Sequence, residues 1–297
     1  MRIRLKTWFH NNFVKLAAFL ALVISVSSCK TTAPSTKSQP NYPVRIALVS
    51  DSHVTRGQKD DQPKYRERFE RAIREVNAAG VDLVLMSGDL TENGYKEELA
   101  DYRKIIRQFN APVWYVPGNH DIGNKRVPGN KEAVTFRKLA DYEMRMGNSW
   151  WVREFSGVRV IGINSCILGS GMDREKRMWR DLEKELARPS KKTTLAMLHH
   201  PLFQKSAGEP GGVYWNVEPY PRMRLLGLLK QGGTSVVLSG HLHKALTNSW
   251  ENIQLLTVPS VCHGKAKDKP QWAWMLLTVS GKGKVEHELR VLKEPEP

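Results

Sequence analysis

The sequence has few cysteines, few acidic residues relative to basic ones, and no apolar run long enough to cross a membrane. It contains 297 residues, of which 3 are cysteines, so the disulfide scaffold of a small secreted domain is excluded. A polytopic membrane protein needs repeated runs of about 20 apolar residues, and the sequence has none. Hydrophobic residues make up 40% and charged residues 26%, a composition typical of a folded globular chain rather than a disordered or collagenous one.

Acidic residues are outnumbered, because 46 lysines and arginines stand against 30 aspartates and glutamates and leave a formal charge of +16. Such an excess is compatible with a nucleic-acid partner, with an anionic membrane surface, or simply with solubility. A clustered basic helix or a known nucleic-acid recognition motif is missing from the sequence. Nucleic acid is therefore disfavoured as a partner.

Residues 1–28 have the pattern of a signal peptide. Four basic residues precede an apolar run over residues 16–26, which suits the h-region of a signal peptide and is too short for a membrane span. The run ends in Val26, Ser27, Ser28 and Cys29, which resembles the lipobox of bacterial lipoproteins, where the cysteine is diacylated and becomes the first mature residue. An ordinary secretory signal with an incidental cysteine is the alternative.

If Cys29 is lipidated, the protein is expected to be anchored in the bacterial cell envelope. Two or three acyl chains on Cys29 would hold the protein stably, whereas one chain alone binds marginally. Lys30 replaces the aspartate that retains lipoproteins at the inner membrane, which favours the outer membrane where there is one. Residues 29–43 are rich in serine, threonine and proline and predict an extended tether. Loss of the four signal-peptide charges lowers the net charge from +16 to +12.

Residues 44–293 predict one α/β domain. Continuous apolar runs, typical of buried strands, alternate with residues spaced as on one face of a helix. The expected strands lie in residues 44–50, 81–88, 111–118, 158–165, 193–200, 234–241 and 253–260, and the helical patterns in residues 69–76, 178–186 and 225–229. No internal repeat or second linker is visible, and the tail after Lys293 is expected to be loose.

Polar residues of metal-binding type follow five of the expected strands. In open α/β sheets the loops at the carboxyl ends of strands converge on one crevice, so these groups are expected to meet. Taken singly, each has a simpler explanation, since aspartate and asparagine favour turns and helix caps and a lone histidine is commonly a hydrogen-bonded core residue. Taken together, aspartate, asparagine and histidine without cysteine predict a site for two divalent or mixed-valence ions such as Mn, Fe, Zn or Co.

These residues resemble, in type and order, the motifs of the calcineurin-like metallophosphoesterase superfamily over about residues 44–262. The motifs are Asp51-x-His53, Gly88-Asp89, Gly118-Asn119-His120-Asp121, His199-His200 and Gly240-His241-x-His243. The resemblance implies two facing mixed β-sheets flanked by helices, with a dinuclear metal site at the carboxyl ends of the strands. It also implies that one metal is bound by Asp51, His53 and His243. The other metal would be bound by Asn119, His199 and His241, with Asp89 as the bridge.

The same resemblance implies hydrolysis of a phosphate ester without a phosphoenzyme. Two ions roughly 3.5 to 4 Å apart would activate a bridging hydroxide and clamp the attacking and leaving oxygens. His120 would be the non-ligand histidine that meets the substrate or protonates the leaving group. Phosphomonoester hydrolysis at the same site, or a non-catalytic binding module in the envelope, are the alternatives. The sequence says nothing of the oligomeric state.

Two branches of the superfamily are disfavoured by the residues after Asp89. The Asp-Arg-Gly sequence of the Ser/Thr protein phosphatases is missing, and Glu92 stands where purple acid phosphatases have a metal-bound tyrosine. The remaining pattern, GDLTENG, resembles the branch that contains cyclic-nucleotide and glycerophosphodiester phosphodiesterases. A phosphodiester is therefore the favoured substrate.

Several residues outside the ligand set carry weaker expectations. His200 is a possible substrate contact, and Tyr214 or Trp215, in a glycine-rich segment, is expected either to stack on a base or aryl group of the substrate or to anchor a surface loop. His263 follows the expected strand at residues 253–260 and could reach the site, but a solvated loop residue is the favoured expectation. Trp150 and Trp151 are expected to precede a strand and lie in the core, and whether Cys166 pairs with Cys262 depends on geometry that sequence does not supply.

Overall fold

The computed structural model describes residues 43–59, 61–263, 272–281 and 283–293. The predicted signal peptide, the lipidation site Cys29, nearly all of the tether and the tail after Lys293 lie outside these ranges. Across the described part of the chain, no helix is both long enough and apolar enough to cross a membrane.

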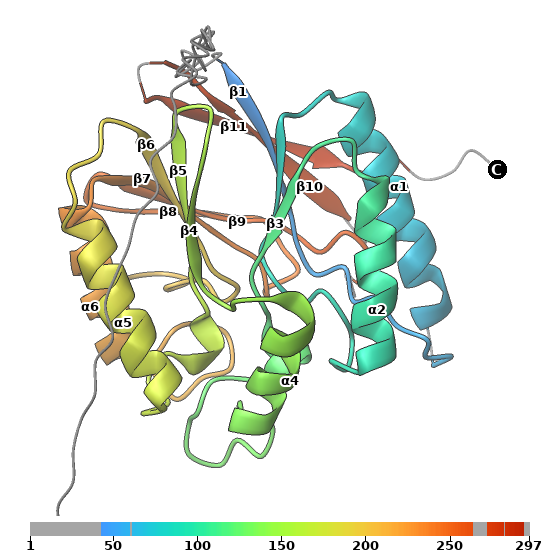
Figure 1. The fold of residues 1–297 in the computed structure, drawn as a ribbon, viewed down its shortest axis with the longest axis horizontal. Helices are drawn as coiled ribbons and strands as arrows, with labels where there is room; N and C mark the ends of the chain where they lie inside the picture. Colours follow the sequence, from blue (N-terminus) through green and yellow to red (C-terminus); the bar gives the residue numbers. More distant parts are fainter. Residues whose placement is uncertain (1–42, 60, 264–271, 282, 294–297) are drawn as a thin grey trace, which may run out of the picture. The chain divides into compact units, whose positions relative to one another are not determined.

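Two mixed β-sheets form the centre of the domain, as Figure 1 shows. The first has the strand order β11-β10-β1-β2-β3 and the second β4-β5-β6-β7-β9-β8. The first sheet contains β1 (Val44–Val49), β2 (Leu83–Met86), β3 (Val113–Tyr115), β10 (Ala273–Val279) and β11 (Val285–Val291). The second contains β4 (Trp151–Phe155), β5 (Val158–Gly162), β6 (Thr193–Met197), β7 (Thr234–Ser239), β8 (Leu246–Trp250) and β9 (Ile253–Thr257). The expected pair of mixed sheets is confirmed.

Parallel pairing places the carboxyl ends of the central strands at one edge. Strands β1, β2 and β3 are parallel to one another, and so are β5, β6, β7 and β9, whereas β4, β8, β10 and β11 pair in antiparallel fashion. All seven strands expected from apolar runs are present. In the described parts of the chain, the four additional strands are the antiparallel ones. Strands β4, β8 and β11 are half-exposed or more and lack a continuous apolar run, whereas β10 is buried and was not expected.

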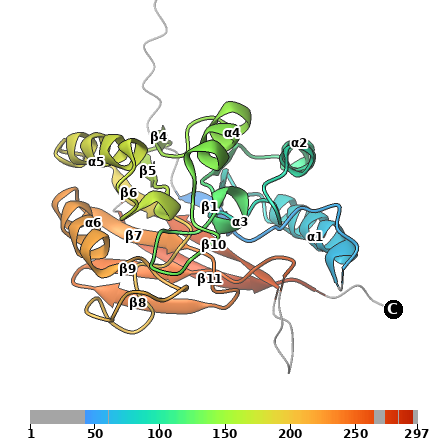
Figure 2. The same ribbon diagram turned by 90° about the horizontal axis from the view of Figure 1, so that it is seen from below.

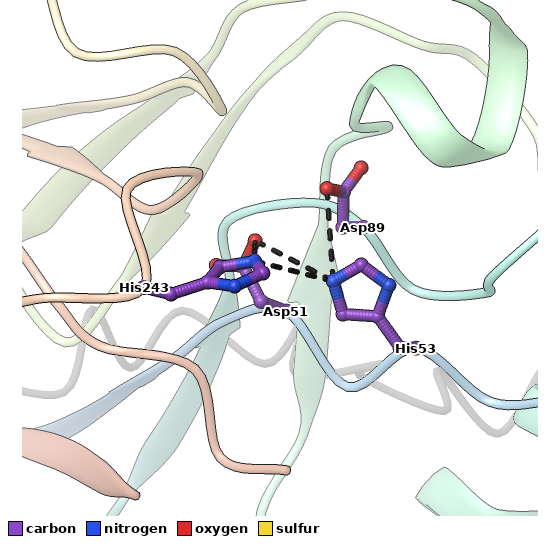
Figure 3. A group of neighbouring side chains, drawn as sticks. All are labelled: Asp51, His53, Asp89 and His243. Carbon is purple, nitrogen blue, oxygen red and sulfur yellow. Dashed lines mark hydrogen bonds and ion pairs between the residues drawn. The ribbon is translucent and has the colours of Figure 1, made fainter. Parts of the chain in front are cut away.

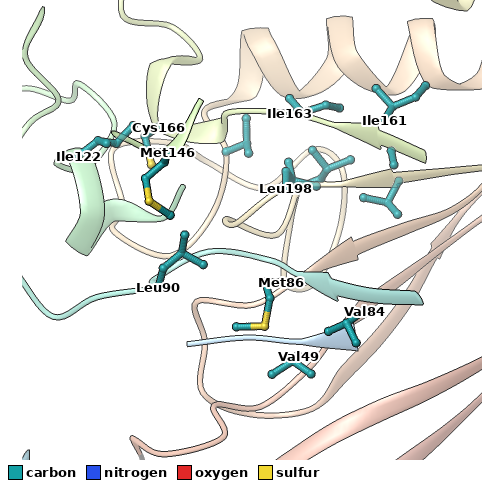
Figure 4. Close-up of a cluster of buried hydrophobic side chains, with 14 of the residues drawn as sticks. Val49, Val84, Met86, Leu90, Ile122, Met146, Ile161, Ile163, Cys166 and Leu198 are labelled. Atoms are coloured by element: carbon teal, nitrogen blue, oxygen red, sulfur yellow. The ribbon is translucent and has the colours of Figure 1, made fainter. Parts of the chain in front are cut away.

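Side-chain alternation in β1 shows why the central strands are apolar on both faces. Ile46 and Leu48 point into a cluster of buried side chains drawn from both sheets, which is the core between them. Ala47 and Val49 point the other way, into a cluster that includes the helices. Figure 4 shows part of the helix-side cluster, with Val49 and neighbours from both sheets. A strand buried on both faces is largely apolar, and in β1 the run from Ile46 to Val49 ends at the polar residues Ser50 and Asp51.

Helices cover the outer faces of both sheets. Figures 1 and 2 show α1 (Tyr65–Ala78) and α2 (Lys96–Ile105) beside the first sheet, and α5 (Asp173–Leu186) and α6 (Pro219–Gln231) beside the second. The expected apolar faces are buried, for example Phe69 and Ile73 on α1 and Leu182 on α5. The helices α3 (Asn119–Ile122) and α4 (Phe136–Met146) follow β3.

Two expectations for aromatic and cysteine residues are settled by this architecture. The expectation that Trp150 and Trp151 lie in the core was wrong: Trp151 is the first residue of the edge strand β4, so both rings are only half-buried and pack against the margin of the core. Cys166 and Cys262 are both free and buried, so they do not form a disulfide.

Candidate dinuclear metal site

The polar residues expected at the strand ends converge at one edge of the two sheets. Asp51, Asp89 and Asn119 follow β1, β2 and β3 of the first sheet, while His199 and His241 follow β6 and β7 of the second. Among the described residues, three groups of metal-binding side chains have ligand atoms that all lie within 4.8 Å of one another: Asp51, His53, Asp89 and His243; Asp89, His199 and His241; and His53, Glu92 and His120. The sequence motifs, scattered over almost 200 residues, are therefore brought together by parallel strands.

The first ligand group consists of Asp51, His53, Asp89 and His243, shown in Figure 3. His243 Nε2 lies 3.2 Å from Asp51 Oδ1 and 3.3 Å from His53 Nε2. His53 Nε2 lies 3.8 Å from Asp89 Oδ2. Atoms that share an ion at about 2.1 Å stand roughly 3 to 3.5 Å apart, so these separations are close to those of a common coordination sphere.

The second ligand group consists of Asp89, His199 and His241, joined by Asn119. His199 Nε2 lies 3.1 Å from Asp89 Oδ2, 3.2 Å from His241 Nδ1 and 3.0 Å from Asn119 Oδ1. The same carboxylate oxygen, Asp89 Oδ2, approaches both His53 and His199. Asp89 is thus the residue common to both groups, as a bridging ligand would be.

The charge and burial of the two carboxylates fit a pair of cations. Burial opposes ionisation of Asp51 and Asp89, but His243 beside the first and His199 beside the second hold both pKa values below the usual range. Asp51 Oδ1 is buried and has His243 Nε2 3.2 Å away but no hydrogen bond of normal geometry, an arrangement that is costly unless a cation or another donor compensates it. Burial and the neighbouring His199 lower the pKa of His241 to about 3, so its ring is neutral and free to act as a ligand.

Each candidate histidine ligand has its second ring nitrogen held by an outer partner. His199 Nδ1 lies 3.0 Å from the carbonyl of Ser87, and His241 Nε2 lies 3.2 Å from the carbonyl of Tyr214. In the first ligand group, His53 Nδ1 lies 2.7 Å from Glu92 Oε2, and His243 Nδ1 lies 2.8 Å from His263 Nδ1. Such partners fix the tautomer and aim the remaining nitrogen, which is characteristic of metal-binding histidines.

The backbone at the site is strained. Among the described residues, seven that are not glycine have a positive φ, and five of these are candidate ligands. They are Asp51, His53, Asp89, His241 and His243, with φ values from 40° to 70°. Left-handed backbone is unfavourable for residues with a Cβ and persists where the surrounding structure imposes it, commonly at functional sites. The remaining two, Ser156 and Glu251, lie in the turns between β4 and β5 and between β8 and β9.

Two motif glycines are needed because ligands pass close to their Cα atoms. A Cβ on Gly118 would stand 2.1 Å from Asp89 Oδ1, and one on Gly240 would stand 2.5 Å from Asp51 Oδ2. Neither carboxylate can withdraw without leaving its ligand position. These glycines therefore let loops from different strands approach within contact distance.

Asp121 holds the loop after β2 against the start of α3, a role that the sequence motif alone did not indicate. Its buried carboxylate accepts hydrogen bonds from the backbone N–H groups of Leu90, Thr91 and Gly118 and from the Thr91 hydroxyl. Burial and the neighbouring Asp89 carboxylate raise the pKa of Asp121 to about 6. Asp121 is a structural carboxylate directly behind the site.

His120 lies beside the ligands without belonging to the two ligand groups just described. Its backbone N–H donates to Asp89 Oδ1 over 2.9 Å, and its ring centroid is 4.7 Å from that of His53. Nδ1 lies 2.7 Å from the carbonyl of Glu92, which leaves Nε2 for a substrate. Burial lowers the pKa of His120, but the Asp89 carboxylate and the Glu92 carbonyl outweigh this and raise it above its ordinary value.

The site opens into a cavity of about 510 Å³. It is lined by Asp89, His120, Tyr214, Trp215, His241, Leu242, His243, Lys244 and His263. Tyr214 and Trp215 are 41% and 50% exposed, so aromatic surface is available at its rim. A larger cavity of about 660 Å³, beside β4 and α5, contains none of the candidate site residues.

The segment that carries Tyr214 and Trp215 is anchored from beneath. Buried Lys125 donates to the Asn216 carbonyl and pairs with Glu218, while buried Arg222 donates to the carbonyl of Val217. The Tyr214 hydroxyl also lies 2.9 Å from Asn119 Nδ2. The glycine-rich segment is therefore held in place over the second ligand group.

Two expectations for neighbouring histidines do not match their positions. His200 was expected as a possible substrate contact, but it is fully buried behind the site, with its ring nitrogens 2.9 Å from Ser165 Oγ and 3.0 Å from Asn124 Oδ1. His263 was expected to be a solvated loop residue, but it lines the cavity and touches His243. Its position shortly after the expected strand at residues 253–260 was the sequence signal for the alternative that it reaches the site.

Comparisons with known proteins bear on the identity of this arrangement. A family model described as calcineurin-like phosphoesterase matches residues 44–245. The chain is 31% identical over 236 residues to a probable glycerophosphodiester phosphodiesterase, GpdQ, of Arcobacter nitrofigilis, covering 75% of this chain and 80% of that protein. It is 28% identical over 232 residues to a probable cyclic nucleotide phosphodiesterase of Rhodococcus erythropolis, covering 73% of this chain and 71% of that protein.

Solved structures share the fold at low sequence identity. A dimetal phosphatase from Danio rerio has a TM-score of 0.54 and 11% identity, covering 84% of this chain and 100% of that one. The purple acid phosphatase PPD1 from yellow lupin has a TM-score of 0.57 and 17% identity, covering 84% of this chain and 51% of that one.

Proposed function

Because the chain belongs to the calcineurin-like phosphoesterase family, and is thereby a metal-dependent hydrolase of phosphate esters, we propose that it hydrolyses phosphodiesters at the edge where the two sheets meet. One observation supports this most: two ligand groups from both sheets share Asp89 and open into the cavity that His120 lines.

The residues present fit a pair of metal ions. Asp51, His53 and His243 would hold one, Asn119, His199 and His241 the other, and Asp89 both. Oxygen and nitrogen donors without sulfur suit Mn, Fe, Zn or Co, and availability in the cell decides among them. Two such ions, when bound, supply the positive charge and the activated water that hydrolysis of a phosphate ester requires.

The chain's own residues orient the substrate and move the proton. His120 presents Nε2 to the cavity because its Nδ1 is held by the Glu92 carbonyl. In the protonated form this nitrogen donates to the leaving oxygen, a contribution of about 10² to 10⁴ in rate for general acids. Only two carboxylates contribute to the ligand set, so the loaded site keeps a net positive charge that attracts a phosphate ester.

A diester is favoured over a monoester by the rim of the cavity and by the relatives. Trp215 and Tyr214 offer apolar surface for a second organic group on the phosphate, which a monoester lacks. The relatives named above are described as acting on glycerophosphodiesters and cyclic nucleotides. Phosphomonoester hydrolysis at the same site is the second candidate.

The protein would act in the bacterial cell envelope, tethered by a lipid on Cys29. This part of the proposal rests on the sequence pattern of residues 1–29. Labelling of the full chain with a radioactive fatty acid, compared with Cys29→Ala, tests it. The label is expected on the wild-type chain alone, with the variant released from the membrane fraction. Equal labelling of both chains would contradict it.

The catalytic proposal is tested on the chain from residue 31 onward. Its bound metal is counted, and hydrolysis of an aryl phosphodiester is compared with that of the matching monoester after addition of Mn, Zn, Fe or Co. About two ions per chain and a higher kcat/KM for the diester are expected. Two ions with preference for the monoester would support the second candidate. A protein that takes up no metal and turns over neither ester would favour the non-catalytic binding module.

A further inference from the structure

We propose that Glu92 is a positioning residue, which orients the ligand His53 through its carboxylate and sets the reactive nitrogen of His120 through its carbonyl. The proposal rests on the function proposed above, and it assigns a role to a residue that the family resemblance left without one. Glu92 contacts both His53 and His120, whose ring centroids are 4.7 Å apart.

The carboxylate contact with His53 is short and sheltered. Glu92 Oε2 stands 2.7 Å from His53 Nδ1, with the His53 side chain 1% exposed and that of Glu92 17%. The opposite nitrogen, Nε2, faces Asp51 and Asp89 at 3.9 and 3.8 Å. An acceptor at Nδ1 keeps the proton there, so Nε2 is left with its lone pair toward the ligand group. A carboxylate acceptor also makes the imidazole a stronger donor to a cation.

The backbone carbonyl of Glu92 contacts the His120 ring, and this contact does not involve the Glu92 side chain. Its carbonyl lies 2.7 Å from His120 Nδ1, while its carboxylate stays 4.0 Å from that nitrogen. His120 therefore donates from Nδ1 to a fixed acceptor and presents Nε2 to the cavity. One residue thus settles which nitrogen each of two neighbouring histidines offers.

The peptide around Glu92 is held by contacts that do not involve its carboxylate. The N–H of Glu92 donates to the Val54 carbonyl over 3.2 Å, and the N–H of Asn93 donates to Glu98 Oε2 over 2.9 Å. Glu98 is buried and also accepts from the Thr55 hydroxyl. Removing the Glu92 carboxylate should therefore leave the carbonyl in place and affect His53 alone, so the two roles separate in an experiment.

The experiment compares Glu92→Ala and Glu92→Gln with the wild-type chain from residue 31 onward, using calorimetric titration with Mn²⁺ or Zn²⁺ and kinetics at saturating metal. Loss of an outer partner typically weakens metal binding by about 10 to 100-fold. Glu92→Ala is expected to weaken one of two binding steps by that factor, with a smaller loss of kcat at saturating metal than His120→Ala shows. Glu92→Gln keeps an acceptor oxygen for His53 Nδ1 and is expected to recover most of the affinity.

Glu97→Ala is the matched control, because Glu97 is exposed in the same segment and contacts only Lys96 among charged groups of the described residues. Wild-type affinity in both binding steps of Glu92→Ala would overturn the proposal. So would a loss of kcat at saturating metal as large as that of His120→Ala, or a third bound ion in the wild type that Glu92→Ala removes. A wild-type chain that binds no metal would instead defeat the proposed function itself.

Discussion

The two ligand groups are built in different ways, although they share Asp89. In the first, Asp51, His53 and His243 all have a positive φ, and the outer partners of the histidines are the side chains of Glu92 and His263. In the second, only His241 and the shared Asp89 are left-handed, and the outer partners of the histidines are backbone carbonyls. The histidines of the first group are thus held by titratable side chains, and those of the second by backbone carbonyls, with fewer left-handed residues.

The two ligand groups also differ in charge. Asp51 gives the first ligand group a carboxylate of its own, whereas the second has only histidine and asparagine side chains besides Asp89. Affinity for divalent cations rises with the number of charged ligands. The first group is therefore expected to bind its ion more tightly, and the second to depend more heavily on the shared carboxylate. Substitutions of single site residues test this difference between the two ligand groups.

Asp89→Ala is expected to have the largest effect, because it removes the only residue common to both groups. Metal content should fall from about two ions per chain to none, and turnover should fall to background. Elemental analysis and diester kinetics measure both. A variant that kept both ions and wild-type activity would remove Asp89 from the centre of the site.

Asp51→Asn changes the first ligand group alone, and Asn119→Ala changes the second alone. Each is expected to reduce metal content from about two ions to one at limiting metal, with Asp51→Asn costing more affinity because a charge is lost. Titrations of the two variants under the same conditions measure the affinities. If the ion that remains binds equally tightly in both variants, the expected difference in affinity between the two ligand groups is contradicted.

His120→Ala is expected to leave both halves loaded while slowing the reaction. General acids contribute about 10² to 10⁴-fold, so kcat should fall within that range for substrates with poor leaving groups and less for aryl esters. Metal content serves as the control. A uniform loss on good and poor leaving groups would contradict an acid role.

Tyr214→Phe is expected to have the smallest effect. It removes the hydroxyl that lies 2.9 Å from Asn119 Nδ2 and keeps the carbonyl that holds His241. The expected loss is about 10-fold in affinity of the second ligand group alone, at the low end for an outer partner. Tyr220→Phe, at an exposed tyrosine, is the control. A change confined to the first group would contradict the assignment.

The sequence predicted the strands and the seven ligand candidates because buried parallel strands are apolar runs that end at polar residues. Spacing along the chain then indicated which strand ends carry metal-binding types. Strands β4, β8 and β11 escaped prediction because they are half-exposed or more and lack a continuous apolar run. Strand β10 was missed although it is buried and apolar. The outer partners Glu92, Tyr214 and His263 escaped because their contacts depend on loop conformation, which no periodicity encodes.

His200 is a residue that the sequence motif suggested for the site but that the structure places outside it. It stands next to His199 in the sequence, but successive residues at the end of a strand point to opposite sides, so one ring reaches Asp89 and the other turns into the interior. Adjacency in a motif therefore does not imply a shared role. The prediction was wrong for this residue because a motif does not say which way each side chain faces.

The left-handed residues have a consequence for protein engineering. A graft of the seven ligand side chains onto another α/β sheet would need five positions that are left-handed yet carry a side chain, beside glycines placed where carboxylates pass. Few host loops meet both conditions, so the search for a host should begin from backbone dihedral angles rather than from distances between strand ends.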